Sequence, residues 1–156
     1  MGYTHNWTPK NVSNSKFGEF AEKCETLKDK LPDDIKIRCG MGEREPVFNS
    51  NEVWFNGDGE NDLAHETLLL EPQSTKWSFC KTARKPYDLL VCGCLLLAHF
   101  MLDYEIASDG DISDWYEASL WFNESQNDFI VTPKKLIELF GDDYDNKFQD
   151  EHPELF

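Results

Sequence analysis

The apolar run from Leu89 to Leu102, "LLVCGCLLLAHFML", constrains the fold of this chain more than any other segment. A helix that is apolar on nearly every face has no side to turn to water, so it belongs at the centre of a molecule. The run is interrupted by His99 and is too short to cross a bilayer. Pro86 suits the first turn of a helix, and Asp88 complements its dipole. We therefore expect a buried central helix that begins near Pro86.

The remaining elements follow from periodicity and from turn residues. Apolar residues recur every three or four positions over 15–31, which predicts an amphipathic helix ended by Pro32. Two more helices are predicted, one from Ser113 and one from Pro133 to Gly141. Short strands are expected at 1–8, 35–39, 52–55, 66–71, 76–82 and 105–108, with a polar loop over 40–51.

These elements do not alternate regularly, which favours an α+β fold. We expect a mainly antiparallel sheet of five or six short strands packed on the buried central helix, with three further helices. Residues 1–141 form a single predicted domain, and residues 142–156 form an acidic tail that is expected to be mobile.

Cysteine usage and the N-terminus both predict a cytoplasmic protein. There are five cysteines, an odd number, and they include no C-x-x-C pair. Buried, reduced thiols are the ordinary state of such residues. No basic segment followed by an apolar stretch opens the chain, so no secretory signal is predicted.

Charge is distributed unevenly along the chain, whose net charge is −15. Residues 86–156 hold 16 acidic residues and only three lysines. Direct binding of nucleic acid or of an anionic membrane is disfavoured, because both require cations. The excess of acid allows a basic protein partner, although it also serves solubility alone.

Three cations stand close together in "FCKTARKPYD", residues 79–88. Lys81, Arg84 and Lys85 fall between a predicted strand and the start of the central helix. Cations beside a helix N-terminus attract phosphate or carboxylate, and an arginine grips such groups with two parallel hydrogen bonds. The alternative is that these side chains form surface ion pairs, which contribute about 0–1 kcal/mol each.

Histidines supply the candidates for proton transfer. His5 lies on an aromatic strand and His65 precedes Glu66, so each is a candidate base or ligand contact, or a histidine that only satisfies its own hydrogen bonds. Ser, His and Asp residues occur, but no local context links them into a triad. Turn chemistry accounts for "FNGDG" and "SDGDISD", the second of which fails the EF-hand pattern, and no zinc spacing is present. No metal or cofactor is therefore predicted.

Five segments resemble, in the same order, a family of small proteins from bacteria and their phages. They are "MGYTHNW", "FNGDG", "HET", "FCKTARKPYD" and "SDGDISDW", and the resemblance runs from Met1 to about Trp121. Family members typically carry MGYTHYW, FNGDG, HETF, FCKTARKPYDLVVC and SSDGD. Asp88, Ser108 and Trp115 also lie in these shared motifs. The resemblance implies no particular activity or fold, but its polar and aromatic positions imply a ligand site.

The function predicted from these features is that of a small-molecule binding module for a nucleotide-like or other anionic ligand. The phage resemblance implies a counter-defence role in the host cytoplasm. The residues predicted to bind the ligand are Tyr3, His5, Trp7, Asn56, Asp58, His65, Glu66, Lys81, Thr82, Arg84, Lys85, Tyr87 and Asp109. Two alternatives stay open. One is an acidic, DNA-mimic-like inhibitor of a basic host protein such as a nuclease. The other is a phosphoester-acting enzyme with His5 or His65 as base and Arg84 as the stabiliser of anionic charge.

Overall fold

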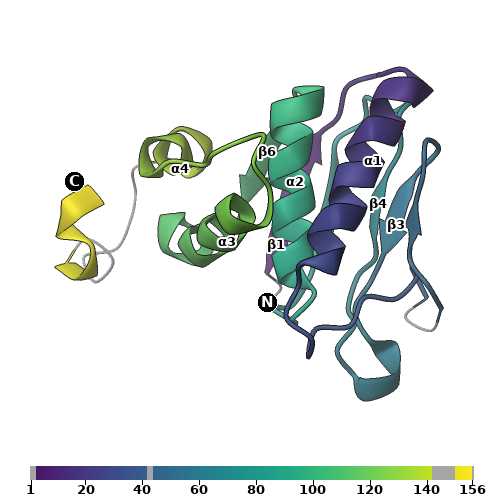
Figure 1. Ribbon diagram of the computed structural model, residues 1–156, viewed down its shortest axis with the longest axis horizontal. Helices are drawn as coiled ribbons and strands as arrows, with labels where there is room; N and C mark the ends of the chain where they lie inside the picture. The colour runs from purple at the N-terminus through teal and green to yellow at the C-terminus, as the bar shows by residue number, and fades with distance from the viewer. Residues whose placement is uncertain (1–2, 42–43, 142–149, 156) are drawn as a thin grey trace.

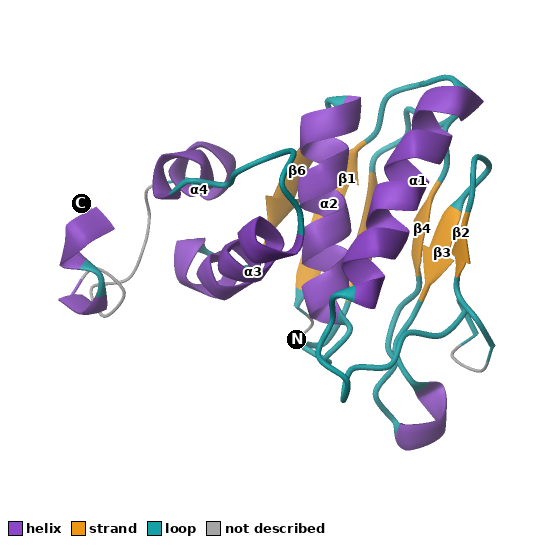
Figure 2. Ribbon diagram, in the orientation of Figure 1, coloured by secondary structure: helices purple, strands orange, loops and turns teal. Residues whose placement is uncertain are grey.

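The computed structural model describes residues 3–41, 44–141 and 150–155 of the chain. Helices and strands mix without regular alternation, as Figure 2 shows, and the predicted α+β class is confirmed. The elements are β1 (Thr4–Thr8), α1 (Asn14–Asp29), β2 (Val47–Phe48), β3 (Val53–Phe55), η1 (Gly59–Asn61), β4 (Leu68–Leu70), β5 (Ser78–Lys81), α2 (Asp88–Leu102), β6 (Glu105–Ser108), α3 (Ile112–Ser125), α4 (Pro133–Phe140) and η2 (Pro153–Leu155). Most of the predicted acidic tail lies outside the described residues.

The prediction of one sheet is wrong, because the strands form two antiparallel three-stranded sheets. Their orders are β5-β1-β6 and β2-β3-β4. The segment that joins β4 to β5 forms hydrogen bonds to the segment between β1 and α1. The Pro72 carbonyl accepts from Val12 N–H at 2.9 Å, and the Gln73 side chain donates to the Val12 carbonyl. The two sheets meet through a backbone bond from Glu66 N–H to the Lys81 carbonyl, just before the start of β4. Residues of β4 and β5 both line a cleft between the two sheets.

Helices α1 and α2 lie side by side in front of the strands, α3 packs against α2, and α4 packs against α3 and β6 (Figure 1). The central helix is buried as predicted. The side chains of Leu90, Val91, Cys92 and the residues from Cys94 to Ala98 are at most 3 % exposed. Gly93 lies close to the Trp121 ring, where a Cβ would come within 2.8 Å. The segment that most constrains the fold therefore occupies the middle of the molecule.

Local capping signals set the helix boundaries. The Ser13 hydroxyl accepts from Lys16 N–H at 3.1 Å and begins α1. Asp111 forms a capping box with Asp114 at the start of α3. Helix α4 begins at Pro133 and ends at Gly141, whose φ of 82° suits glycine. The caps of α1 and α4 agree with the sequence prediction, whereas α3 is capped by Asp111 rather than beginning from Ser113 as predicted.

Two strand predictions fail around the polar loop. Residues 35–39 contribute only an isolated bridge from Arg38 to Asn56 rather than a strand. The strand β2 lies inside the segment 40–51 that the sequence predicts to be a loop, and it pairs with β3. Both segments border the edge of the second sheet, where few contacts distinguish a strand from extended loop.

Two further observations bear on the environment of the chain. All five cysteines fall within the described residues, where they are buried and form no disulfide. Among the described helices, α2 included, none combines the length and the apolar content that crossing a bilayer requires.

Candidate functional site

A cluster of polar side chains lies where β1, the end of β5, the start of α2 and the end of β6 converge. We call His5, Thr82, Asp88, Cys92 and Ser108 the His5 cluster. His5 faces the helices because β1 alternates, with His5 and Trp7 buried between half-exposed neighbours. Asp88 and Cys92 share one face of α2, one turn apart.

Both imidazole nitrogens of His5 have side-chain partners, and the ring is fully buried. Nε2 lies 2.7 Å from Asp88 Oδ1, and Nδ1 lies 2.7 Å from Ser108 Oγ. The ring is also held edge-on by two aromatic rings, with centroids 5.0 Å away for Tyr3 and 5.1 Å away for Trp115. The imidazole is therefore fixed in one orientation.

Three proton arrangements satisfy this geometry. With the proton on Nε2, His5 donates to Asp88 and the Ser108 hydroxyl donates to Nδ1, which is a Ser–His–Asp relay. With both nitrogens protonated, His5 and Asp88 form a buried ion pair. With the proton on Nδ1 alone, Nε2 turns a lone pair towards Asp88, and a cation is needed between them. The sequence showed no such triad, because these partners lie 103 and 83 positions from His5 along the chain.

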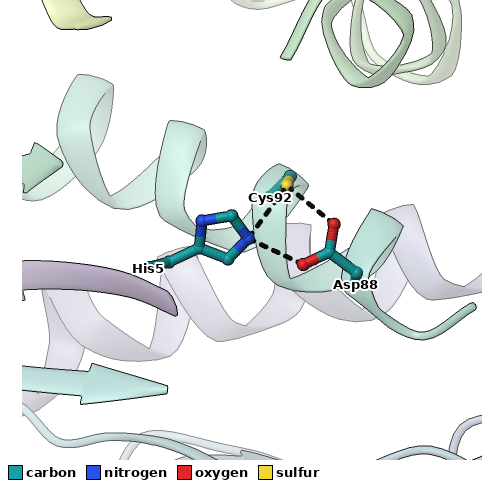
Figure 3. Close-up of side chains that lie close together, drawn as sticks. All are labelled: His5, Asp88 and Cys92. Atoms are coloured by element: carbon teal, nitrogen blue, oxygen red, sulfur yellow. Dashed lines mark hydrogen bonds and ion pairs between the residues drawn. The ribbon is translucent and has the colours of Figure 1, made fainter. Parts of the chain in front are cut away.

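Asp88 is the hub of the cluster. Its Oδ1 accepts the Thr82 hydroxyl at 2.6 Å, and its Oδ2 lies 3.6 Å from Cys92 Sγ (Figure 3). Burial acts to raise the pKa of Asp88, but His5, Thr82 and Cys92 stabilise the carboxylate and bring its pKa below the usual value. Asp88 therefore stays ionised within a half-buried site.

The Cys92 thiol completes the cluster. Burial raises its pKa well above the usual value, and the Asp88 charge raises it further, so the sulfur stays protonated. Cys92 Sγ lies 3.7 Å from His5 Nε2, and Figure 3 shows it beside the same edge of the ring that faces Asp88. A nitrogen, an oxygen and a sulfur thus meet at one place.

The three cations of the central motif diverge to different surroundings. Arg84 pairs with Asp114 at 2.7 Å and lies over the Tyr3 ring, 3.9 Å from its centroid. Lys85 Nζ donates to the Asp62 carbonyl at 2.9 Å. Lys81 Nζ lies 5.8 Å from the centroid of the Phe79 ring.

The divergence follows from a strained turn. Thr82 O accepts from Lys85 N–H at 3.0 Å, and the two residues between them, Ala83 and Arg84, have φ values of 52° and 56°. Two successive positive φ angles define a tight type I′ turn, which normally uses Asn and Gly. The turn sends Lys81 and Arg84 to opposite sides of the chain, so the anion site expected from their closeness in sequence does not follow from it.

A second set of predicted residues is tied to backbone groups. Asn56 donates to the His65 carbonyl at 2.9 Å and accepts from the N–H groups of Gly57 and His65. The Tyr87 hydroxyl donates to the Glu66 carbonyl at 2.5 Å. The His65 side chain is exposed and makes no hydrogen bond, ion pair or ring contact within the described residues. We call Asn56, Gly57, Asp58, His65 and Thr67 the Asn56 cluster.

Asp58 and Asp109 have structural partners. Asp58 accepts from Asn61 Nδ2 at 2.6 Å, a bond that lowers the pKa of its carboxyl despite the opposing effect of burial. Asp109 exchanges two bonds with Thr4: it accepts from Thr4 N–H at 3.1 Å and donates to the Thr4 carbonyl at 2.8 Å. Turn and strand-end chemistry account for both carboxylates.

The sheet β5-β1-β6 carries an exposed aromatic pair that the sequence prediction missed. Trp77 is 54 % exposed and Phe79 is 46 % exposed, and their centroids lie 5.5 Å apart. Phe79 and Lys81 alternate with the buried Cys80, so they project from the face opposite to that of His5. Period-two alternation of Trp77, Phe79 and Lys81 was the signal available in the sequence. We call these three residues the β5 outer face.

The cleft between β4 and β5 opens beside this outer face. Its volume is about 180 Å³, and its lining includes Trp7, Thr67, Leu69, Ser78 and Phe79. Of the residues predicted to bind a ligand, Trp7 lies in this lining. Lys81 lies close to the ring of Phe79, which also lines the cleft. His5 and Thr82 instead belong to the His5 cluster. Tyr3 packs against the His5 ring, and Arg84 lies over Tyr3.

No family model, curated protein or solved structure matches this chain.

Proposed function

We propose that the protein is a small-molecule binding module for a nucleotide-like ligand, and that the ligand occupies the β5 outer face and the adjoining cleft. The observation that carries this proposal is the situation of Lys81. Within the described residues its ammonium has no oxygen partner, whereas Arg84 and Lys85 are bound to protein oxygens. A cation left in that state is available to an anionic group.

Aromatic surface beside a cation suits a nucleotide. A nucleobase stacks on an exposed ring with a gain of about 1–3 kcal/mol, and a phosphate pairs with an ammonium. Trp77 and Phe79 supply two exposed rings, and Lys81 follows on the same face of β5. Longer nucleic acid is disfavoured by the net charge of −15, because it would bring many phosphates against an acidic surface.

The cleft gives the ligand a bounded place rather than a flat surface. Its rim contains Phe79 and Leu69, and Thr67 and Ser78 contribute hydroxyl groups to its lining. A few polar groups in a partly apolar hollow are typical of small-molecule sites. If host nucleotide signals bind there, sequestering such a signal is the counter-defence role that the phage resemblance suggests.

Isothermal titration at low salt tests this proposal. The panel contains nucleoside monophosphates and cyclic dinucleotides, with adenosine as a ligand without phosphate and ribose 5-phosphate as a ligand without a base. We expect a nucleotide to bind more tightly than either fragment and more weakly as salt is added. Phe79→Ala should weaken binding roughly 5- to 150-fold, in line with the loss of one stacked base.

Matched controls separate recognition from general charge and hydrophobicity. Lys81→Ala should weaken binding of the nucleotide, whereas Lys16→Ala removes another exposed lysine, on α1, and should not. Ile130→Ala is the control for Phe79→Ala, because it shortens another apolar side chain, one that is 59 % exposed. The proposal fails if the folded wild type binds nothing in the panel, or if the two site variants bind like their controls.

A further inference from the structure

We propose that His5, Asp88 and Cys92 together bind one transition-metal ion, with Zn²⁺ as the preferred metal. The inference does not rest on the nucleotide proposal, because the His5 cluster lies on the opposite face of β1 and β5 from Phe79 and Lys81. Three different donor atoms, Nε2, a carboxylate oxygen and Sγ, lie within 4.8 Å of one another. Figure 3 shows all three turned towards a common point.

The separations fit a tetrahedral ion with a small adjustment. Bond lengths of about 2.0–2.3 Å place two ligand atoms of such an ion roughly 3.4–3.6 Å apart. Cys92 Sγ is 3.7 Å from His5 Nε2 and 3.6 Å from Asp88 Oδ2. The His5–Asp88 contact of 2.7 Å is a hydrogen bond and has to open by about 0.7 Å, or Asp88 has to bind through Oδ2.

The surrounding groups are those that support metal ligands. A ligating imidazole usually donates its second N–H to a fixed acceptor, and Ser108 Oγ lies 2.7 Å from His5 Nδ1. The Gly110 N–H donates to that same oxygen at 2.8 Å and holds it in place. A ligating carboxylate is usually hydrogen-bonded as well, and the Thr82 hydroxyl donates to Asp88 Oδ1.

The proton balance of binding is simple. The Cys92 thiol loses its proton to solvent, since a coordinated thiol is deprotonated outright. In neutral His5 the proton shifts from Nε2 to Nδ1, and the Nδ1–H then donates a hydrogen bond to Ser108 Oγ. The metal then lies between Nε2 and the carboxylate, which supplies the cation that this tautomer requires.

The donor set also selects among metals. A thiolate and an imidazole favour Zn²⁺ and its neighbours over Mg²⁺ and Ca²⁺, which prefer oxygen. Three protein ligands leave one tetrahedral position for water or for a substrate atom. The Asp88 side chain keeps 21 % of its surface exposed, so the cluster is not sealed from solvent.

A Ser108–His5–Asp88 relay is the competing use of the same atoms. The relay has no role for Cys92, which nevertheless lies against both Nε2 and Asp88. A metal on Nε2 also prevents the relay, because Nδ1 then carries the proton and cannot accept one from Ser108. The two proposals therefore exclude each other in any one molecule.

Cobalt titration of the tag-free, reduced protein tests the metal site. Co²⁺ is used because its thiolate charge-transfer band in the near ultraviolet reports a cobalt–sulfur bond directly. We expect the band to saturate at one equivalent, to disappear on addition of Zn²⁺, and to be unaffected by Mg²⁺ or Ca²⁺. Ser108→Ala should weaken affinity about 10- to 100-fold while keeping the band.

Cys92→Ala should abolish the band, and Cys94→Ala is its matched control. Both thiols are buried on α2, two residues apart, but Cys94 is not a member of the cluster. Circular dichroism confirms that each variant is folded before titration. A folded wild type without a one-equivalent band overturns the proposal, as does a band that survives in Cys92→Ala. Labelling of Ser108 by a fluorophosphonate in such a metal-free protein would assign the cluster to the relay.

Discussion

His5 and Asn56, the central residues of their clusters, are both buried and polar, yet they bond to different kinds of partner. Asn56 bonds mainly to backbone groups: its amide oxygen accepts two N–H groups, and its amide nitrogen donates to the His65 carbonyl. Among the described residues, the His5 imidazole bonds to side chains, those of Asp88, Ser108 and Cys92. Both clusters contain positions of the shared family motifs, so the motifs alone do not distinguish them.

The difference indicates which buried groups can gain or lose a proton or bind a metal. Backbone groups cannot change protonation, so a side chain that satisfies them fixes the path of the chain. Ionisable side chains that hydrogen-bond to one another can instead exchange protons, or give up a proton and bind a metal. The bonds of Asn56 therefore hold the segment from Asn56 to Thr67 in shape, and the His5 cluster is where we propose that a metal binds.

The largest effect that we expect comes from breaking the structural cluster. Asn56→Ala leaves the N–H groups of Gly57 and His65 without their acceptor in a site where Asn56 is 4 % exposed. Each buried, unsatisfied group costs about 1–3 kcal/mol, so for the two groups we expect a loss of roughly 2–6 kcal/mol in the free energy of unfolding. Urea denaturation measures it.

Asn14→Ala is the control for this change. Asn14 also donates two hydrogen bonds, to Ser50 and Asn51, but the site is exposed and water can replace them. We expect a loss below about 1 kcal/mol for that variant. Equal losses for the two asparagines would remove the distinction between a clamp on buried backbone and an ordinary surface contact.

A smaller effect, with a characteristic pH dependence, is expected from the His5 cluster. The pKa of Asp88 is lowered in the folded protein, so the folded state binds fewer protons than the unfolded chain, whose aspartate pKa is about 3.9. Its contribution is present above that pKa and is lost as pH falls through the folded pKa. Asp88→Asn should cost roughly 1–2 kcal/mol at pH 7, because a charged hydrogen bond becomes neutral.

The test compares urea denaturation of wild type and Asp88→Asn from pH 7 down to about pH 3. The difference between them should shrink as the solution becomes acidic. Asp58 and Asp111 also have lowered pKa values, so the variant should keep part of the acid sensitivity. Asp128→Asn, which removes a surface partner of Lys23, is the control and should show little difference at any pH. A pH-independent loss in Asp88→Asn would contradict the assignment of a charged role.

The sequence predicted the helices far better than it predicted the sites. The central helix, Pro133 and Gly141 act through neighbours in the chain, so local chemistry was sufficient to find them. The split into two sheets is a matter of long-range pairing, such as the bond between Val12 and Pro72, which no local pattern reveals. The same holds for His5, which was a candidate from its own strand but could not be joined to Asp88 and Ser108.

The three cations show the opposite error, since closeness in sequence suggested closeness in space. Lys81 and Arg84 are separated by the turn at Ala83 and Arg84, and they project to different sides. Turns of that type usually contain Asn or Gly, so "TARK" gave no sign of one. The alternation of Trp77, Phe79 and Lys81 was visible but was not used.

That turn provides the smallest predicted effect and the one with an unusual sign. Ala83 has a φ of 52°, and a left-handed conformation costs a non-glycine residue about 1–2 kcal/mol. Glycine removes this cost, although its greater freedom in the unfolded chain costs about 0.5–1 kcal/mol. We therefore expect Ala83→Gly to stabilise the protein by roughly 0.5 kcal/mol.

The same substitution in a strand should act in the other direction. Ala107 lies exposed on β6, paired with Asn6, and its φ is not among the positive values. Ala107→Gly should destabilise by about 0.5–1 kcal/mol, because only the cost in the unfolded chain remains. Opposite signs in urea denaturation would show that the turn beside the His5 cluster is held under strain by its surroundings. If both variants lose stability equally, the backbone there is relaxed, and the divergence of Lys81 and Arg84 has to be ascribed to their side-chain partners alone.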